Sequence, residues 1–261
     1  MATWCTPQQT PPLVGTRAGG EVVAHHGAWV LYSVFQPIYA AGHAQPAAFE
    51  ALIRAHDMHT GREVPLSELF HRPANRDDGV LLDRLCRLLH VLNFQRQSHD
   101  DTLLYLNLDA GYLQSLRPGL HGQFFSALQA EVPHDPAKII LEITETEIES
   151  RDVLAGIVDS FKQRGFRVAI DDFGARHSNF DRLWGLTPDI VKIDRELLLQ
   201  AEINPRAGKI FPKLIDIIHD LAAQVVCEGI ETPAQQALAV RCQADFLQGY
   251  LFARPDRTLQ S

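Results

Sequence analysis

From Val30 onward, short β-rich runs alternate with amphipathic segments typical of helices, and this alternation constrains the fold more than any other feature. Several runs, among them 138–143, 189–193 and 224–228, are apolar on both faces, as expected of parallel strands covered by helices. The predicted strands are 30–40, 48–55, 102–109, 138–144, 167–173, 189–194, 224–230 and 245–252. Eight such units predict an α/β fold, a (β/α)8 TIM-like barrel with its site at the carboxyl ends of the strands. A doubly wound open sheet is the alternative, and there the missing GxGxxG turn argues against a dinucleotide site.

The first 25 residues lack an apolar period and hold three prolines and the pair Gly19-Gly20. We therefore expect residues 1–25 to form a loose tail or connector and residues 26–261 to form the barrel domain. The four cysteines are scattered without a CxxC pair, which favours a reducing compartment and no disulfide framework. No apolar run is long enough to span a membrane and the start is no signal peptide, so we expect a cytoplasmic protein without membrane contact within this chain.

Acidic residues outnumber basic ones, 32 to 24, which leaves a formal net charge of −8. This balance argues against a protein that binds long nucleic acid by neutralising many phosphates. A smaller phosphate ligand, or one bridged by metal ions, remains compatible with it.

Polar residues fall near the ends of the predicted strands, where a barrel would need them. A charge inside an apolar strand is costly unless it is paired or bound to a metal, and for any one residue a core ion pair is an equal alternative. Seven predicted strands share the pattern, and closure of the barrel would bring the residues to one mouth. Since carboxylates so close repel one another, we expect cations among them, and oxygen ligands favour Mg²⁺ or Mn²⁺. The residues concerned are Glu50, Asn107, Glu142, Asp171, Asp172, Lys192, Glu228, Glu231 and Gln248.

The adjacent pair Asp171-Asp172 closes its strand. If the chain turns there, Asp171 can bridge two ions while Asp172 holds the second, although Asp172 as a cap of the following turn is an alternative. Paired divalent ions about 3.5–4 Å apart are a common apparatus for phosphodiester hydrolysis. The residues therefore indicate a two-metal phosphodiesterase.

A series of motifs, taken together, resembles the EAL-domain family of cyclic di-GMP phosphodiesterases over about residues 30–255. The motifs are QPI (Gln36 to Ile38), Glu50-Ala51-Leu52 followed by Arg54, Asn107, LEITE (Leu141 to Glu145), DDFG (Asp171 to Gly174), VKID (Val191 to Asp194), EGIET (Glu228 to Thr232) and QGYLF (Gln248 to Phe252). The resemblance implies a barrel whose first strand is antiparallel. It also implies opening of cyclic di-GMP to linear pGpG with Mg²⁺ or Mn²⁺, which lowers the level of this second messenger in bacterial signal transduction.

The resemblance also implies roles for individual residues. By motif position, one ion has the ligands Glu50, Asn107, Glu142 and Asp171, and the other has Asp171, Asp172 and Glu228. Lys192 matches the lysine that orients the attacking water. The substrate-contacting positions are Gln36, Leu52 and Arg54, joined by Gln248 near the site, while Glu145 and Glu231 match residues that support nearby loops. For Lys192 a structural pair with Asp194 or another acid, for Arg54 a solvated surface position and for Gln248 a turn cap are the alternatives.

The chain departs from the family after DDFG, where Ala175, Arg176 and His177 follow Gly174. Arg176 replaces a glycine and His177 an aromatic residue, so the backbone of this loop is expected to differ. In the family this loop couples metal binding to dimerisation, which leaves a homodimer open for this chain. A sensor domain in a longer natural chain is equally compatible with the sequence.

Two functions besides hydrolysis of cyclic di-GMP fit the same motifs. A catalytically silent receptor would bind cyclic di-GMP and signal by protein contact, but such members usually lack some residues of the set matched here by Glu50, Asp171, Asp172 and Lys192. The other alternative is a two-metal barrel hydrolase that acts on a different phosphodiester. The complete set favours the enzyme.

Overall fold

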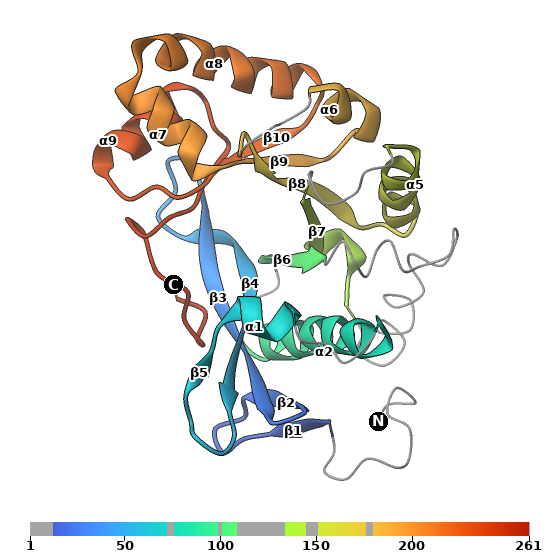
Figure 1. Cartoon of the computed structure of the whole chain (residues 1–261). Coiled ribbons are helices and arrows are strands. Elements are labelled where there is room, and N and C mark those ends of the chain that lie inside the picture. Colours follow the sequence, from blue (N-terminus) through green and yellow to red (C-terminus); the bar gives the residue numbers. More distant parts are fainter. Residues whose placement is uncertain are drawn as a thin grey trace.

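Eight strands close into a barrel, the architecture expected from the alternating sequence (Figure 1). The computed structural model describes residues 13–71, 76–98, 101–108, 134–144, 151–175 and 180–260. In order around the barrel, the strands are β3 (Trp29–Ala40), β4 (Pro46–Asp57), β6 (Leu103–Leu108), β7 (Ile139–Thr144), β8 (Arg167–Phe173), β9 (Ile190–Ile193), β10 (Gln224–Cys227) and β11 (Phe246–Leu247). Pairing of β11 with β3 completes the ring.

Strand direction confirms the expectation of an antiparallel first strand. β3 runs antiparallel to both of its barrel neighbours, β4 and β11. The other seven strands are parallel to one another. The carboxyl ends of these seven strands therefore meet at one mouth, and β3 reaches that mouth with its amino-terminal half.

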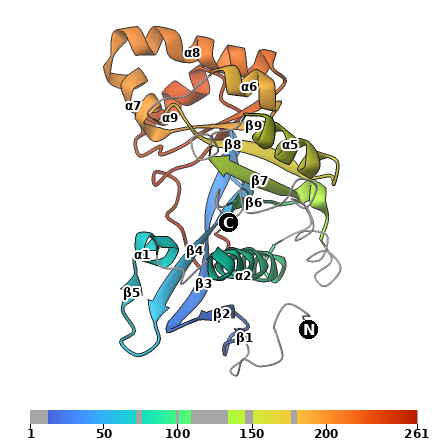
Figure 2. The ribbon, with the colours of Figure 1, turned by 45° about the vertical axis from the view of Figure 1, so that its right-hand side comes forward.

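Successive residues of the parallel strands point to the inside and the outside of the barrel, and both sets are apolar. Helices cover the outward-facing set. Figures 1 and 2 show the later helices on the outer face of β8 to β10 and α2 beside β3, β4 and β6. The helical elements are α1 (Leu66–His71), α2 (Arg76–Gln95), the 3₁₀ turn η1 (Pro136–Lys138), α5 (Arg151–Lys162), α6 (Phe180–Leu186), α7 (Arg195–Ile203), α8 (Pro205–Asp220) and α9 (Pro233–Arg241). None of the described helices is both long and apolar enough to cross a bilayer.

The inside of the barrel is filled by an apolar layer to which each strand contributes one residue. Its members are Ile38, Ala48, Tyr105, Ile140, Ala169, Ile190, Val226 and, partly buried, Phe246. Separate apolar clusters fill the space between the strands and the helices outside them. The barrel is thus a packed core, and a site has to lie above this layer.

The segment before the barrel differs from the expected loose tail. Residues 13–26 contain two antiparallel strands, β1 (Val14–Thr16) and β2 (Val22–His26), and β2 pairs with the start of β3. Gly19 and Gly20 have φ values of 99° and 90°, so the glycine pair forms the tight turn of a hairpin instead of marking a loose chain. The Asn93 side chain of α2 bonds both the backbone N–H and the carbonyl of Val22, each at 2.8 Å. A further short strand that the sequence did not indicate, β5 (Glu63–Val64), pairs with β4.

Candidate active site at the carboxyl ends of the strands

A polar layer lies directly above the apolar layer inside the barrel. Each strand contributes one residue, two positions beyond its apolar residue and toward the same mouth. Because side chains on one face of a strand recur at every second residue, both layers share the barrel interior. The members are Gln36, Glu50, Asn107, Glu142, Asp171, Lys192, Glu228 and Gln248. Eight of the residues predicted for the site are therefore brought together by one structural rule.

Lys192 places its ammonium group among four carboxylates of this layer. Its Nζ atom lies 2.5 Å from Glu142 Oε1 and 2.7 Å from Glu228 Oε1. The same atom lies 3.2 Å from Asp171 Oδ1 and 3.4 Å from Glu50 Oε2. The Lys192 side chain is only 1% exposed, so water screens these charges poorly. Four carboxylates around one ammonium leave a surplus of buried negative charge.

This surplus shifts the pKa values of the layer. Burial, followed by the carboxylate of Glu50, raises the pKa of Glu142 well above its ordinary value. Burial, together with Asp171 and Glu50 and against the effect of Lys192, raises the pKa of Glu228 to about 8. Burial alone would lower the pKa of Lys192, but the surrounding carboxylates raise it well above its ordinary value. The layer therefore favours the uptake of positive charge, as protons or as cations.

Glu50 is held from three sides. Asn107 Nδ2 donates to its Oε1 atom at 3.0 Å, and Gln248 Nε2 donates to its Oε2 atom at 2.8 Å. Burial would raise the pKa of Glu50, but Lys192 and these two amides outweigh it and lower the pKa. Glu50 thus stays ionised while Glu142, whose Oε1 atom contacts Lys192 and whose Oε2 atom accepts no hydrogen bond from the described residues, favours a proton or a cation.

Asp171 and Asp172 are adjacent in sequence, yet both of their carboxylates reach the same place. The pairing of β8 with β9 shifts register between Ile170 and Phe173, and Asp172 has a φ of 55°. Aspartate adopts this left-handed region more readily than most residues. One carboxylate oxygen from each of Asp171, Asp172 and Glu228 lies within 4.8 Å of the others. This bulge makes a three-carboxylate group that fits a divalent cation.

A cavity of about 270 Å³ opens beside the polar layer. Gln36, Glu50, Glu228 and Gln248 form its inner wall, and Asp194, Arg195, Glu231 and Tyr250 contribute to its rim. Glu231 is not part of the carboxylate cluster, because its Oε2 atom pairs with Arg195 Nη2 at 2.9 Å. Asp194 accepts from the N–H of Glu196 as the cap of α7 and does not pair with Lys192.

Sequence reasoning missed Asp194, Arg195 and Tyr250 as components of this cavity. Asp194 ends a predicted strand, Arg195 follows it and Tyr250 lies inside QGYLF, so their position in the chain was the available signal. Their side chains are of types common on any surface, and only the fold brings them to the rim. Gly229 and Gly249 also line the cavity, and a Cβ atom on Gly249 would lie 2.0 Å from the carbonyl oxygen of Ile230.

Leu52 and Arg54 lie outside the polar layer. They follow Glu50 on the same face of β4, where β4 has left the barrel and pairs with β3 and β5. Arg54 Nη1 donates to the Ile53 carbonyl at 2.8 Å, and no ion pair joins Arg54 to a carboxylate of the described residues. The remaining predicted residue, Glu145, lies outside the described residues, as do Arg176 and His177.

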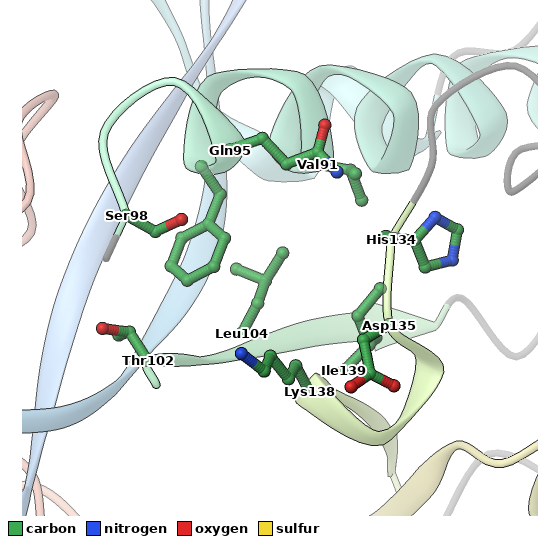
Figure 3. A pocket seen from close by; sticks show the side chains of 10 residues that line it. Val91, Gln95, Ser98, Thr102, Leu104, His134, Asp135, Lys138 and Ile139 are labelled. Atoms are coloured by element: carbon green, nitrogen blue, oxygen red, sulfur yellow. The ribbon is translucent and has the colours of Figure 1, made fainter. Parts of the chain in front are cut away.

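A larger cavity of about 400 Å³ lies elsewhere, and Figure 3 shows its lining. Its walls come from the end of α2 and from the amino ends of β6 and β7, including Gln95, Thr102, Leu104 and Lys138. Among its described lining residues the one carboxylate belongs to Asp135, which caps η1 by accepting from Ala137 N–H. This cavity lies at the barrel end opposite the polar layer and does not share its chemistry.

Comparisons with known proteins agree with this geometry. Residues 28–255 match the EAL domain family. The chain is 30% identical over 227 residues to the bifunctional diguanylate cyclase/cyclic di-GMP phosphodiesterase MucR of Pseudomonas aeruginosa, an alignment covering 85% of this chain and 32% of that protein. Curated relatives are longer than this chain. The aligned regions cover 17% of PdeA and 61% of PdeL, two Escherichia coli proteins, and 32% of MucR.

Solved structures share the fold. A standalone EAL protein from Vibrio cholerae in its c-di-GMP bound form superposes with a TM-score of 0.76 at 26% identity, over 88% of this chain and 94% of that one. A manganese/cy-diGMP complex of Klebsiella pneumoniae BlrP1 gives 0.74 at 26% identity, over 89% and 61%. Together with the family match over most of the sequence, these likenesses assign the chain. It belongs to the EAL domain family.

Proposed function

We propose that this chain is a metal-dependent phosphodiesterase that hydrolyses cyclic di-GMP to linear pGpG in the bacterial cytoplasm. The observation that carries the proposal is the polar layer, in which Lys192 contacts Glu50, Glu142, Asp171 and Glu228 at one mouth of the barrel. Relatives named as cyclic di-GMP phosphodiesterases and a neighbour solved with cyclic di-GMP support the substrate.

The residues present fit divalent cations. All the candidate donors are oxygens, and the group formed by Asp171, Asp172 and Glu228 is already close enough to share one ion. In the proposal Glu50, Asn107, Glu142 and Asp171 hold one Mg²⁺ or Mn²⁺, and Asp171, Asp172 and Glu228 hold a second. The Oε2 atom of Glu142, buried with no hydrogen-bond donor among the described residues, supports the first set. Such a pair of ions, when bound, supplies activation of water and neutralisation of the charge that develops on the phosphate.

The protein's own groups then bind and orient the substrate. Lys192 donates toward the attacking water, and the neighbouring carboxylates keep its ammonium group charged. Arg54, which among the described residues donates only to the Ile53 carbonyl, clamps phosphate oxygens. Gln36, Leu52 and Gln248 complete the binding surface, and Glu145 and Glu231 support the loops around it.

The deciding experiment incubates the protein with cyclic di-GMP and Mg²⁺ or Mn²⁺ and follows pGpG by chromatography. We expect turnover in the wild type and none in Glu50→Ala, which removes a metal ligand and the partner of three donors. Lys192→Ala should lower kcat more than it weakens substrate binding. Ca²⁺ should inhibit, because it is larger and less strict in geometry than Mg²⁺.

Three outcomes would change the assignment. Tight binding of cyclic di-GMP with no turnover in either metal would identify a silent receptor. Turnover of other phosphodiesters but not of cyclic di-GMP would identify a different hydrolase. A wild-type kcat in either variant would contradict the roles given to Glu50 and Lys192.

A further inference from the structure

Beyond the barrel, β3 and β4 continue as a two-stranded ribbon that carries the face of the polar layer outward (Figures 1 and 2). Tyr32 on β3 stands directly opposite Arg54 on β4, and His56 follows Arg54 on the same face. Arg54 lies four positions after Glu50, which is about 13 Å along an extended strand. A ligand that contacts both the polar layer and this part of the ribbon therefore has to span about 13 Å.

Two segments remote in sequence bring arginines to this ribbon. Arg17, in the turn of the β1–β2 hairpin, places Nη2 3.1 Å from His56 Nε2. Arg257, in the segment after the barrel, stacks its guanidinium 4.0 Å from the ring centre of Tyr32. Backbone hydrogen bonds between Phe35 and Asp256, at 2.7 and 3.0 Å, fix that segment along β3.

Three carboxylates lie near the cluster of Arg17, Arg54 and Arg257. Glu21 is the one carboxylate that pairs with it among the described residues, at 3.4 Å from Arg17 and 3.1 Å from Arg257. The nearby carboxylates of Asp57 and Asp256 are engaged with their own turns, through Thr60 and Thr258 respectively. The charges of the cluster thus balance in sum, and among the described residues Arg54 is its one guanidinium group with no carboxylate in contact.

Aromatic rings accompany these charges. The rings of Tyr32 and His56 lie 5.8 Å apart, and both side chains are partly exposed. Partial burial, then the charges of Arg17 and Arg257, lower the pKa of His56, so its imidazole stays neutral at pH 7. Guanidinium groups beside a neutral ring and a phenol offer both stacking and hydrogen bonds to a nucleotide.

Some residues of this cluster lie outside the part of the chain that matches the family. The family match covers residues 28–255, whereas Arg17 and Glu21 precede it and Arg257 follows it. We propose that Arg257 and Arg17, acting with Tyr32 beside Arg54, complete a subsite for the half of the cyclic dinucleotide farther from the polar layer. This inference rests on the proposed function. It assigns substrate affinity to the flanking segments of this chain.

The test compares Arg257→Ala with the wild type on two substrates in Mg²⁺. For cyclic di-GMP we expect KM to rise about tenfold with kcat within about twofold, the loss of one charge-assisted or stacked contact. For bis(p-nitrophenyl) phosphate, a diester too small to reach the ribbon, kcat/KM should not change. Arg206→Ala, which removes an exposed arginine at the start of α8, controls for net charge and should leave both substrates unaffected.

Glu21→Gln separates a binding role from a structural one. This variant breaks the ion pairs of Arg17 and Arg257 but keeps both guanidinium groups. If the arginines contact the ligand, Glu21→Gln retains or lowers the KM for cyclic di-GMP. If they only tie the hairpin to the C-terminal segment, Glu21→Gln raises KM as Arg257→Ala does, and the inference is overturned.

Calorimetric titration of cyclic di-GMP in Ca²⁺ keeps this inference separate from the proposed function. Wild-type turnover with an unchanged KM and Kd in Arg257→Ala would overturn the subsite and leave the phosphodiesterase standing. Binding without turnover that weakens about tenfold in Arg257→Ala would support the subsite on a silent receptor. Absence of both binding and turnover in the wild type would overturn both.

Discussion

Lys192 is the residue on which the polar layer depends. Its ammonium is the one Lys or Arg charge in contact with Glu50, Glu142, Asp171 and Glu228 among the described residues. Removing one partner of a buried ionic group leaves the others uncompensated, which costs far more than the loss of a surface pair. The residue proposed to act on the substrate therefore also holds the mouth of the barrel together.

Replacing Lys192 by Met keeps the length of the side chain and removes its charge. We expect the free energy of unfolding in EDTA to fall by about 3–5 kcal/mol, and Mg²⁺ to restore more stability in this variant than in the wild type. Urea unfolding with EDTA and with Mg²⁺ measures both. Lys209→Met, on the exposed side of α8, is the matched control and should change stability by less than about 0.5 kcal/mol. Equal losses in the two variants would refute the argument.

The buried imidazole of His90 on α2 should make the free energy of unfolding depend on pH. Burial, followed by Arg87 and Arg54, lowers the pKa of His90 to about 3, and its Nδ1 atom lies 2.8 Å from Ser33 Oγ. Since the unfolded chain takes up this proton near pH 6.5, it binds more protons than the folded one between pH 6.5 and 3. The stabilisation from neutral His90 is complete above pH 6.5 and declines as the pH falls.

The variant His90→Gln isolates this effect, because glutamine does not titrate and can still bond Ser33. Between pH 7 and pH 5 the wild type should lose about 2 kcal/mol more unfolding free energy than the variant. Urea unfolding at half-unit pH steps gives the two curves. Parallel curves would show that His90 takes up its proton equally in both states.

Residue chemistry was the most predictable part of the site, and geometry the least. The sequence indicated Glu50, Glu142 and Asp171 because a charge in an apolar strand needs a reason. It did not indicate Arg195 or Tyr250, which the fold brings to the cavity rim, or Arg257, which reaches Tyr32 from the far end of the chain. Such neighbours depend on loop paths that no local pattern encodes.

At the scale of elements, the eight barrel strands were predictable and the hairpin was not. Parallel strands buried on both faces leave long apolar runs, whereas β1 is three residues long and β2 five. The burial of Val22 and Ala24 comes from packing with Leu31 and Leu89, residues that only the fold brings near. The Gly19-Gly20 pair was the remaining signal, and it is typical of loose chain as well as of tight turns.

Two glycines predict opposite effects of the same substitution. At Gly249 an added Cβ meets the backbone of Ile230, in the loop that links Glu228 to Glu231, so Gly249→Ala should cost about 2 kcal/mol or more. At Gly156, exposed in α5, nothing lies within 4 Å, and Gly156→Ala should stabilise by about 0.5–1 kcal/mol. Thermal unfolding of both variants is the check. A shift of the same sign in both would contradict the close approach at Gly249.

At the scale of the whole molecule, the net charge of −8 is a poor guide to the ligand. Glu50 of the polar layer and Arg54 of the ribbon lie on one face of β4, so charges of opposite sign are separated along this strand. Such a division suits a ligand whose reacting phosphate meets cations at the layer while its other half meets arginines. The positions of the charged residues along the strands are therefore more informative about the ligand than the net charge.

The β1–β2 hairpin packs against β3 and α2, and truncation tests its contribution to the free energy of unfolding. Chains beginning at residue 13 and at residue 28 differ only in residues 13–27. The longer chain buries Val22, Val23 and Ala24 and satisfies both polar ends of Asn93, while the shorter one exposes their partners on β3 and α2. With roughly 1.5–3 kcal/mol for each buried valine, the shorter chain should unfold at a clearly lower urea concentration, by about 3 kcal/mol or more. Equal urea midpoints would mean that the barrel is stable without its hairpin, and that β2 adds contacts without adding stability.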